Sequence, residues 1–168
     1  MKGHQRPQGW VVAAQALVMC VVMSGCSIPG GGSVPGGGSV ACASWVSYES
    51  PADAMAAADV VVVTDGPAAS AGTTHLFGVS ANVHSVHVAD VLKGSDVRAG
   101  DDLEVTSTPA TCTSGGSYPD GDPLDASGTL VLFLSRHADT HALSTATPAQ
   151  GVVAATADGE VPVAWPTP

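Results

Sequence analysis

Three carboxylates lie within six residues of one another in the segment Asp120-Gly121-Asp122-Pro123-Leu124-Asp125. Carboxylate oxygens are ligands that hard cations such as Ca²⁺ prefer, so this segment is a candidate calcium-binding loop. An EF-hand loop also requires a central glycine and a glutamate at its twelfth position, and the segment lacks both. We therefore predict an acidic turn here, with a calcium site as the alternative.

Five histidines follow the N-terminal apolar segment: His75, His84, His87, His137 and His141. Zinc needs three or four ligands that converge on one point. His84 and His87 are three residues apart in a strand-like stretch, so we expect them to point to opposite faces. The residues between His137 and His141 are expected to form a turn. The sequence therefore assigns no metal ligand and predicts no cofactor.

No catalytic motif is recognisable in the chain. Gly-x-Ser-x-Gly, His-Glu-x-x-His and a phosphate-binding glycine loop are all missing from the sequence. Dispersed catalytic residues leave no local pattern, so an extracytoplasmic hydrolase remains an alternative. The simpler expectation is a noncatalytic protein.

Charge and length limit the class of protein further. The chain has 168 residues, enough for one domain with a modest core, and 45% of them are hydrophobic. Five basic residues stand against 15 acidic ones, which gives a formal net charge of -10. Nucleic acid is excluded as a partner because so few basic side chains cannot neutralise its phosphates.

The first 25 residues have the layout of an export signal. Lys2 and Arg6 precede an apolar stretch from Trp10 to Met23, after which small residues follow. About 14 residues in a helix span ~21 Å, whereas the hydrocarbon core of a bilayer is ~30 Å thick. A cleaved signal peptide over residues 1–25 is therefore favoured over a membrane span.

A cysteine stands directly after this signal, and the stretch Met23-Ser24-Gly25-Cys26 resembles the lipobox of bacterial lipoproteins. The resemblance implies that Cys26 receives a thioether-linked diacylglycerol and that signal peptidase II cuts in front of it. Two or three acyl chains would hold the mature protein at the extracytoplasmic face of the cell membrane. The alternative is an ordinary secretory signal with a free Cys26.

Residues 26–41 are predicted to be a flexible tether. The sequence Pro-Gly-Gly-Gly-Ser-Val occurs at 29–34 and again at 35–40, and so glycine-rich a repeat cannot form a core. About 15 such residues have an end-to-end distance of ~20 Å. Removal of residues 1–25 leaves three basic residues against all 15 carboxylates, a formal -12, so residues 42–168 are predicted to form one acidic domain.

The remaining cysteines predict a disulfide. Cys20 leaves with the signal and Cys26 is acylated, which leaves Cys42 and Cys112 in an oxidising exterior. A bridge between them would close a loop of about 70 residues. A metal pair or a reactive thiol is the alternative.

The acidic domain is predicted to be mainly β with one short helix. Ser50 and Pro51 supply the capping residue and the first helical residue, and the helix continues to Ala58. Hydrophobic runs or alternation predict strands at 60–63, 77–92 with a bulge near Ser85, 103–106, 129–135, 141–144, 152–155 and 160–165. Loops are predicted at 66–73 and 109–128.

The order of these elements is similar to that in the netrin and tissue-inhibitor-of-metalloproteinase-like group of OB-type barrels. The likeness is carried by Cys42, the helix to Asp59, residues 60–63, 86–94 and 103–106, Cys112, and residues 128–134. It implies a small, five-stranded, partly open OB-like β-barrel with the helix packed against it and Cys42 linked to Cys112. The inhibitors chelate a protease metal through an N-terminal cysteine, but Cys42 is internal and Cys26 would be acylated. That activity is therefore not expected here.

Together these features predict a lipid-anchored surface lipoprotein with a signal peptide, a tether and one acidic β domain. Its expected function is noncatalytic binding of an extracytoplasmic protein or a small ligand. A metal- or calcium-binding protein and a hydrolase without a recognisable motif are the alternatives.

Overall fold

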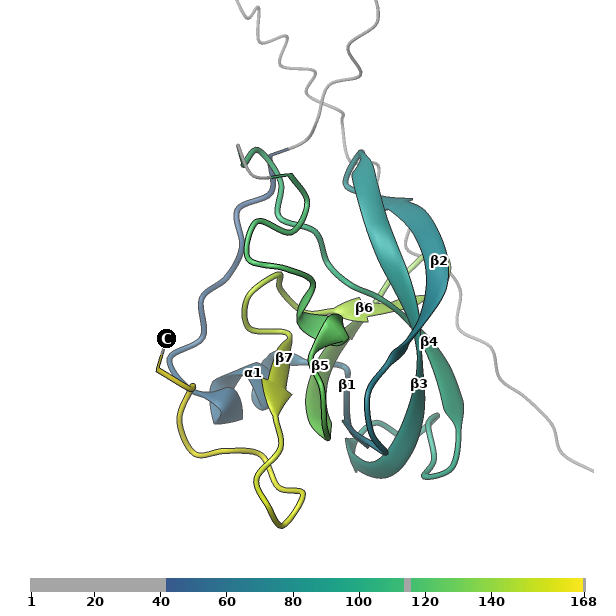
Figure 1. Ribbon diagram of the computed structural model, residues 1–168, viewed down its shortest axis with the longest axis vertical. Coiled ribbons are helices and arrows are strands. Elements are labelled where there is room, and N and C mark those ends of the chain that lie inside the picture. The colour runs from purple at the N-terminus through teal and green to yellow at the C-terminus, as the bar shows by residue number, and fades with distance from the viewer. Residues whose placement is uncertain (1–41, 114–115, 168) are drawn as a thin grey trace, which may run out of the picture. The chain divides into compact units, whose positions relative to one another are not determined.

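The structure is a computed structural model that describes residues 42–113 and 116–167 (Figure 1). Its elements in chain order are α1 (Pro51–Ala57), β1 (Val60–Thr64), β2 (Ala69–Leu76), β3 (Val79–Lys93), β4 (Asp102–Thr106), the 3₁₀ helix η1 (Pro123–Asp125), β5 (Leu130–Arg136), β6 (Leu143–Thr145) and β7 (Val152–Ala154). The predicted mainly β fold with one short helix is confirmed. Among the residues described, no helix is long and apolar enough to cross a bilayer.

Five strands form a closed barrel. They pair in the order β1-β3-β4-β6-β5, and β5 pairs again with β1. Only the β4–β6 pair among these is parallel. Strand β2 extends the sheet beyond β3, and β7 pairs with β5. The small OB-like barrel predicted from the sequence is confirmed, and the β1–β5 ladder closes it.

Strand β1 is buried on both faces, as its run of valines predicted. Because side chains alternate along a strand, Val60 and Val62 face the barrel interior, while Val61 and Val63 face the layer that contains α1. The interior cluster is completed by Val86, Val88, Val97, Val105, Leu124, Leu130, Leu132, Leu134 and Leu143. The outer cluster is completed by Ala54, Ala58, Val131, Phe133 and Val153.

Helix α1 begins where the sequence predicted and ends at Ala57, one residue earlier than predicted. The Ser50 hydroxyl accepts from the Asp53 backbone amide, and the Asp53 side chain accepts from the backbone amide of Ser50, which completes a capping box. At the other end of the helix, Lys93 Nζ donates to the carbonyls of Met55 and Ala56 at 3.1 and 2.8 Å. A cation from β3 thus satisfies carbonyls that the last helical turn leaves free.

The predicted loop at 66–73 is wrong, because most of it belongs to β2. This strand pairs with β3 to form a hairpin whose turn is Phe77-Gly78. Seven of its eight residues are exposed, so neither face imposes the hydrophobic alternation by which a strand is recognised.

Two other predictions need correction. Residues 160–165 form no strand: Pro162 cannot donate to a ladder, and the Trp165 ring packs edge-on against Phe133 instead. The bulge expected near Ser85 is not in β3 at that point, because β3 keeps regular pairing with β4 through Ser85. The register shift lies in the partner strand β2, between Ser70 and Gly72.

The predicted disulfide between Cys42 and Cys112 is present, with Cα atoms 5.4 Å apart. It joins the segment that precedes α1 to the connection between β4 and β5. Nearby, the backbone amide of Ala43 donates to Thr111 Oγ1 at 2.8 Å. The extended segment before α1 is therefore fixed to the barrel at its start.

We predict that replacing both Cys42 and Cys112 by serine lowers the free energy of unfolding by ~4 kcal/mol. The unfolded chain would lose a cross-link between residues 70 positions apart, and this constraint stabilises the native state by limiting the unfolded one. Urea unfolding measures the difference. The reduced wild-type protein is the control and should match the double variant. An oxidised wild-type domain no more stable than the variant would contradict the prediction.

Candidate functional site

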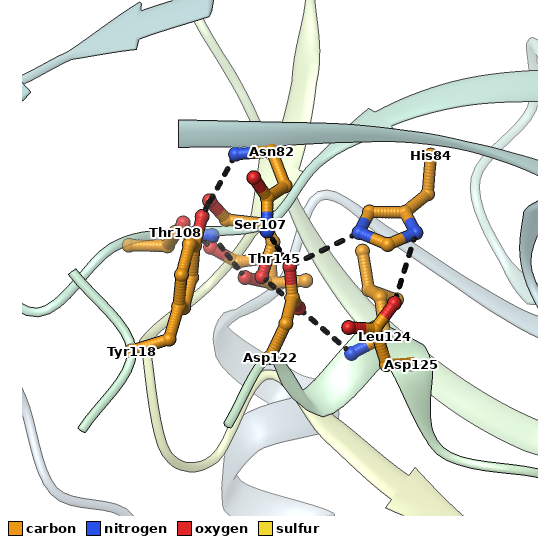
Figure 2. Close-up of polar contacts among 9 residues, drawn as sticks. All are labelled: Asn82, His84, Ser107, Thr108, Tyr118, Asp122, Leu124, Asp125 and Thr145. Carbon is orange, nitrogen blue, oxygen red and sulfur yellow. Dashed lines mark hydrogen bonds and ion pairs between the residues drawn. The ribbon is translucent and has the colours of Figure 1, made fainter. Parts of the chain in front are cut away.

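Asp122 lies at the centre of a polar network between the barrel and the long β4–β5 connection (Figure 2). The residue is the N-cap of η1, where its Oδ1 accepts from the backbone amide of Leu124 at 3.0 Å. Only 2% of its side chain is exposed. Local capping chemistry therefore places the carboxylate, and the fold then covers it.

Four donors saturate this carboxylate. Besides Leu124, Oδ1 accepts from Ser107 Oγ at 2.6 Å. The second oxygen, Oδ2, accepts from Asn82 Nδ2 at 2.7 Å and contacts His84 Nε2 at 3.0 Å. A carboxylate offers about four acceptor positions, so Asp122 has little capacity left for a further partner.

The network keeps Asp122 charged. Burial raises the pKa of the Asp122 carboxyl, but the hydrogen bonds from Ser107, Asn82, Leu124 and His84 outweigh burial, and the net pKa is below the usual value. These four donors come from β3, from the residue that follows β4 and from η1. The ionised carboxylate therefore ties the connection to two neighbouring barrel strands.

Tyr118 makes a second tie between the same elements. Its hydroxyl accepts from the Asn82 backbone amide at 3.0 Å and donates to the Ser107 carbonyl at 2.7 Å. Burial raises the pKa of this phenol, so it stays protonated and keeps its donor role at neutral pH. The Tyr118 ring and Asp122 together fix residues 117–126 against the barrel (Figure 2).

A cavity of about 700 Å³ lies beside the network. One wall is formed by the fixed segment, with Tyr118, Pro119 and Pro123, and the opposite wall by Pro148 and Ala149 in the β6–β7 connection. Asp120 and Asp125 also line it. Its volume lies within the ~300–1,000 Å³ typical of small-ligand sites, and its lining combines apolar rings with a few polar groups.

Ser107, His84 and Asp122 are the three residue types of a hydrolytic triad, but they are connected in the wrong order. Asp122 lies between the other two and accepts from both. A catalytic serine must instead contact the imidazole that removes its proton, while the carboxylate supports the far side of that ring. Ser107 is also fully buried. The three residues thus attach the β4–β5 connection to the barrel, and their arrangement contains no activated nucleophile.

The structure disperses the other histidines. His84 is buried and His87 is exposed, as expected for residues on opposite faces of β3. His87 pairs with Asp102 at 2.8 Å, and this hydrogen bond raises the His87 pKa. His137 contacts Ser144 Oγ at 3.1 Å, and the predicted turn separates it from His141, which precedes β6 and is not yet in a strand.

The acidic loop does not gather its three carboxylates on one point. Asp122 is turned into the barrel, while Asp125 lies 4.0 Å from the other ring nitrogen of His84 and is 69% exposed. In residues 42–113 and 116–167, no group of three or more histidine, cysteine, aspartate or glutamate side chains could hold a metal ion. The predicted lipidation residue, Cys26, lies outside the described residues.

The sequence pattern did not predict the network around Asp122, although it contained one indication of a buried histidine. His84 has the same parity as Val86 and Val88, two buried residues of β3, so the alternation already placed the imidazole on the core face. A buried histidine needs a polar partner. No local pattern identified Asp122 as that partner, because 38 residues separate the two.

In comparisons with known proteins, no family model, no curated protein and no solved structure matches the chain.

We predict that Asp122→Asn lowers the free energy of unfolding by about 2–3 kcal/mol at neutral pH, because an amide nitrogen then faces donors. The native pKa of Asp122 lies below its unfolded value, so its stabilisation is present above about pH 4 and is lost as the pH falls through the native value. The variant should therefore lose less stability on acidification. Chemical denaturation at pH 7 and pH 3 measures both effects. Asp120→Asn, at an exposed neighbour, is the control, and equal acid sensitivity in wild type and Asp122→Asn would contradict the prediction.

We also predict that millimolar Ca²⁺ leaves the melting temperature of the domain unchanged. A cation that binds only the native state raises its stability by an amount that grows with the logarithm of the ratio of cation concentration to Kd. Here the four donors on Asp122 already occupy the oxygens that would have been the central ligands of the acidic loop. Differential scanning calorimetry with Ca²⁺ and with Mg²⁺ measures this. A Ca²⁺-specific rise that Asp125→Asn abolishes would restore the calcium alternative.

Proposed function

We propose that this protein is an exported lipoprotein, acylated at Cys26, whose β-barrel is a noncatalytic binding module at the extracytoplasmic face of the cell membrane. The observation that carries the anchor is the stretch Met23-Ser24-Gly25-Cys26 at the end of an apolar signal. The Cys42–Cys112 disulfide supports export independently, because disulfides persist in oxidising compartments.

The cavity supports the binding module. Its volume and its lining of rings suit a small ligand or a side chain of a partner protein. The Asp122 network is the group of polar side chains nearest to the cavity, but the Asp122 oxygens already accept hydrogen bonds from within the protein. What the network does is hold one wall of the cavity in place, so the cavity is preformed, and a preformed cavity lowers the entropic cost of binding.

The anchor is tested by Cys26→Ser in the producing cell. We expect the wild-type protein to sediment with membranes, to incorporate labelled palmitate and to lose residues 1–25, whereas the variant should keep the signal and carry no label. Cys20→Ser is the matched control, because that cysteine leaves with the signal. If Cys26→Ser still carries label at the mature size, the proposed anchor is wrong.

The binding site is tested by Ala149→Trp. Ala149 is exposed on one wall of the cavity, so an indole there should occupy the cavity without disturbing the core. Native mass spectrometry of wild-type protein captured from intact cells should detect an added mass that Ala149→Trp lacks. Ala52→Trp, at an exposed position on α1, is the control. An added mass that survives Ala149→Trp would place the ligand elsewhere.

A further inference from the structure

One end of the barrel carries no acidic or basic residue, although the domain as a whole is strongly acidic. Three segments of the sequence, 42–48, 66–89 and 105–119, contain no Asp, Glu, Lys or Arg, and neither do 126–135 and 140–157 elsewhere in the domain. All 15 carboxylates and the three basic residues that follow the signal lie outside them. Where uncharged segments meet at one end of an acidic domain, a negatively charged surface repels that end less than the others.

The fold brings parts of these segments together at one end, which we call the uncharged pole: residues 42–46, residues 75–80 around the hairpin turn, and residues 110–113 and 116–117. Cys42 is bonded to Cys112, and Ser117 Oγ donates to the Ser80 carbonyl at 2.9 Å. A hollow of about 260 Å³ between hairpin and connection is lined by Val79, Ala110, Cys112, Thr113, Gly116 and Ser117. In Figure 1 the tip of the β2–β3 hairpin and the β4–β5 connection lie at the same, upper end.

The pole exposes apolar side chains. Three large hydrophobic residues are exposed in the part of the chain that the structure describes, and two of them, Val46 and Phe77, belong to the pole. They are 65% and 39% exposed. The Phe77 ring packs edge-on against Trp45, with ring centroids 5.2 Å apart. We call Trp45, Val46 and Phe77 the apolar patch: the two rings are in contact, and Val46 is the next residue along the chain from Trp45.

Phe77 has a positive φ, a backbone conformation that is unfavourable for a bulky side chain. It is the first residue of the two-residue hairpin turn, with φ 54°, and Gly78 follows with φ 80°. Positive φ at both central residues defines a type I′ turn, in which asparagine is the favoured first residue and a bulky side chain costs free energy. A phenylalanine here costs backbone free energy, and because 39% of it stays exposed, its contact with Trp45 recovers only part of the burial that this side chain can provide.

The pole is also where the chain from the lipid anchor arrives. Cys42, the first residue that the structure describes, belongs to the pole, and 16 positions separate it from Cys26. A glycine-rich chain of this length spans ~22 Å. The lipid anchor keeps the domain next to the bilayer, so the effective concentration of the apolar patch at the membrane surface is high. The patch can therefore contact the bilayer even if its own affinity is weak.

We propose that the uncharged pole rests on the bilayer, with Trp45, Val46 and Phe77 in the headgroup region. The proposal deepens the lipoprotein function above and rests on the lipid at Cys26. Anionic lipids repel the carboxylates, so the acidic remainder of the domain faces away from the membrane. Trp45 is half-buried with its Nε1 turned inward, so it contributes only the exposed part of its apolar ring to this contact, beside Phe77. The cavity, which Ala110 and Ser117 of the pole help to line, would then be held in a fixed orientation to the membrane.

Trp45 itself can report this contact. The chain has three tryptophans, and Trp10 leaves with the signal. Trp165→Phe keeps a ring against Phe133 and makes Trp45 the single tryptophan of the mature protein. We would reconstitute the lipidated variant into phosphatidylethanolamine–phosphatidylglycerol vesicles whose acyl chains are brominated near the headgroup. The expected result is a blue shift of Trp45 emission and its quenching by the bromines.

Two further variants in the Trp165→Phe background test the patch. Phe77→Asn places the preferred residue in the turn, so the hairpin should still form, but quenching of Trp45 should fall. Val46→Ser should also reduce quenching. Val163→Ser is the matched control, because Val163 is 96% exposed and outside the pole, and it should leave quenching unchanged.

The outcomes separate the two proposals. If the protein does not float with the vesicles, the lipid anchor has failed, and the docking proposal fails with it. If the protein floats while Trp45 keeps the unquenched emission that it has without vesicles, the anchor stands and the docking proposal is wrong. A blue shift that depends on protein concentration without vesicles would assign the patch to contact between two copies of the chain, which also overturns docking on the bilayer.

Discussion

Burial of the Asp122 carboxylate is the interaction on which the arrangement of this domain depends. A charge taken out of water is costly unless donors replace its hydration, and here four donors do so. They come from β3, from the end of β4 and from η1, so the charge is satisfied only when the barrel strands are in register and the β4–β5 connection is folded onto them. Loss of any one element leaves the buried carboxylate without one or two of its four donors.

The same connection shapes both surfaces that the protein presents. Cys112 fixes its first part to Cys42, and Asp122 fixes its second part to the barrel. Tyr118 lies between these two points and hydrogen-bonds to both neighbouring strands through Asn82 and Ser107. A segment with few apolar residues thus becomes a rigid wall without a core of its own. One side of it contributes to the uncharged pole, and the other side lines the cavity.

Charge is segregated in a way that fits a tethered protein. The acidic residues keep most of the surface solvated, whereas the residues of the uncharged pole include none. The hairpin turn holds Phe77 there at a positive φ, which is unfavourable for a bulky side chain. Local departures from favourable backbone chemistry of this kind occur where a surface has a task other than folding. The patch around Trp45 and the cavity would face two different partners, a bilayer and a ligand.

The sequence by itself determined the mainly β class, the helix with its cap, the buried strands β1 and β5 and the pairing of Cys42 with Cys112, because each depends on local periodicity, capping chemistry or a count of cysteines. The barrel was implied only by the resemblance of the element order to OB-type barrels. Only the tertiary structure decided that β2 is a strand, since a ribbon exposed on both faces has no alternation. Only the fold could show which carboxylate of the acidic loop turns inward. Asp122 and His84 are distant in the chain, and their contact exists because barrel closure brings β3 and η1 together.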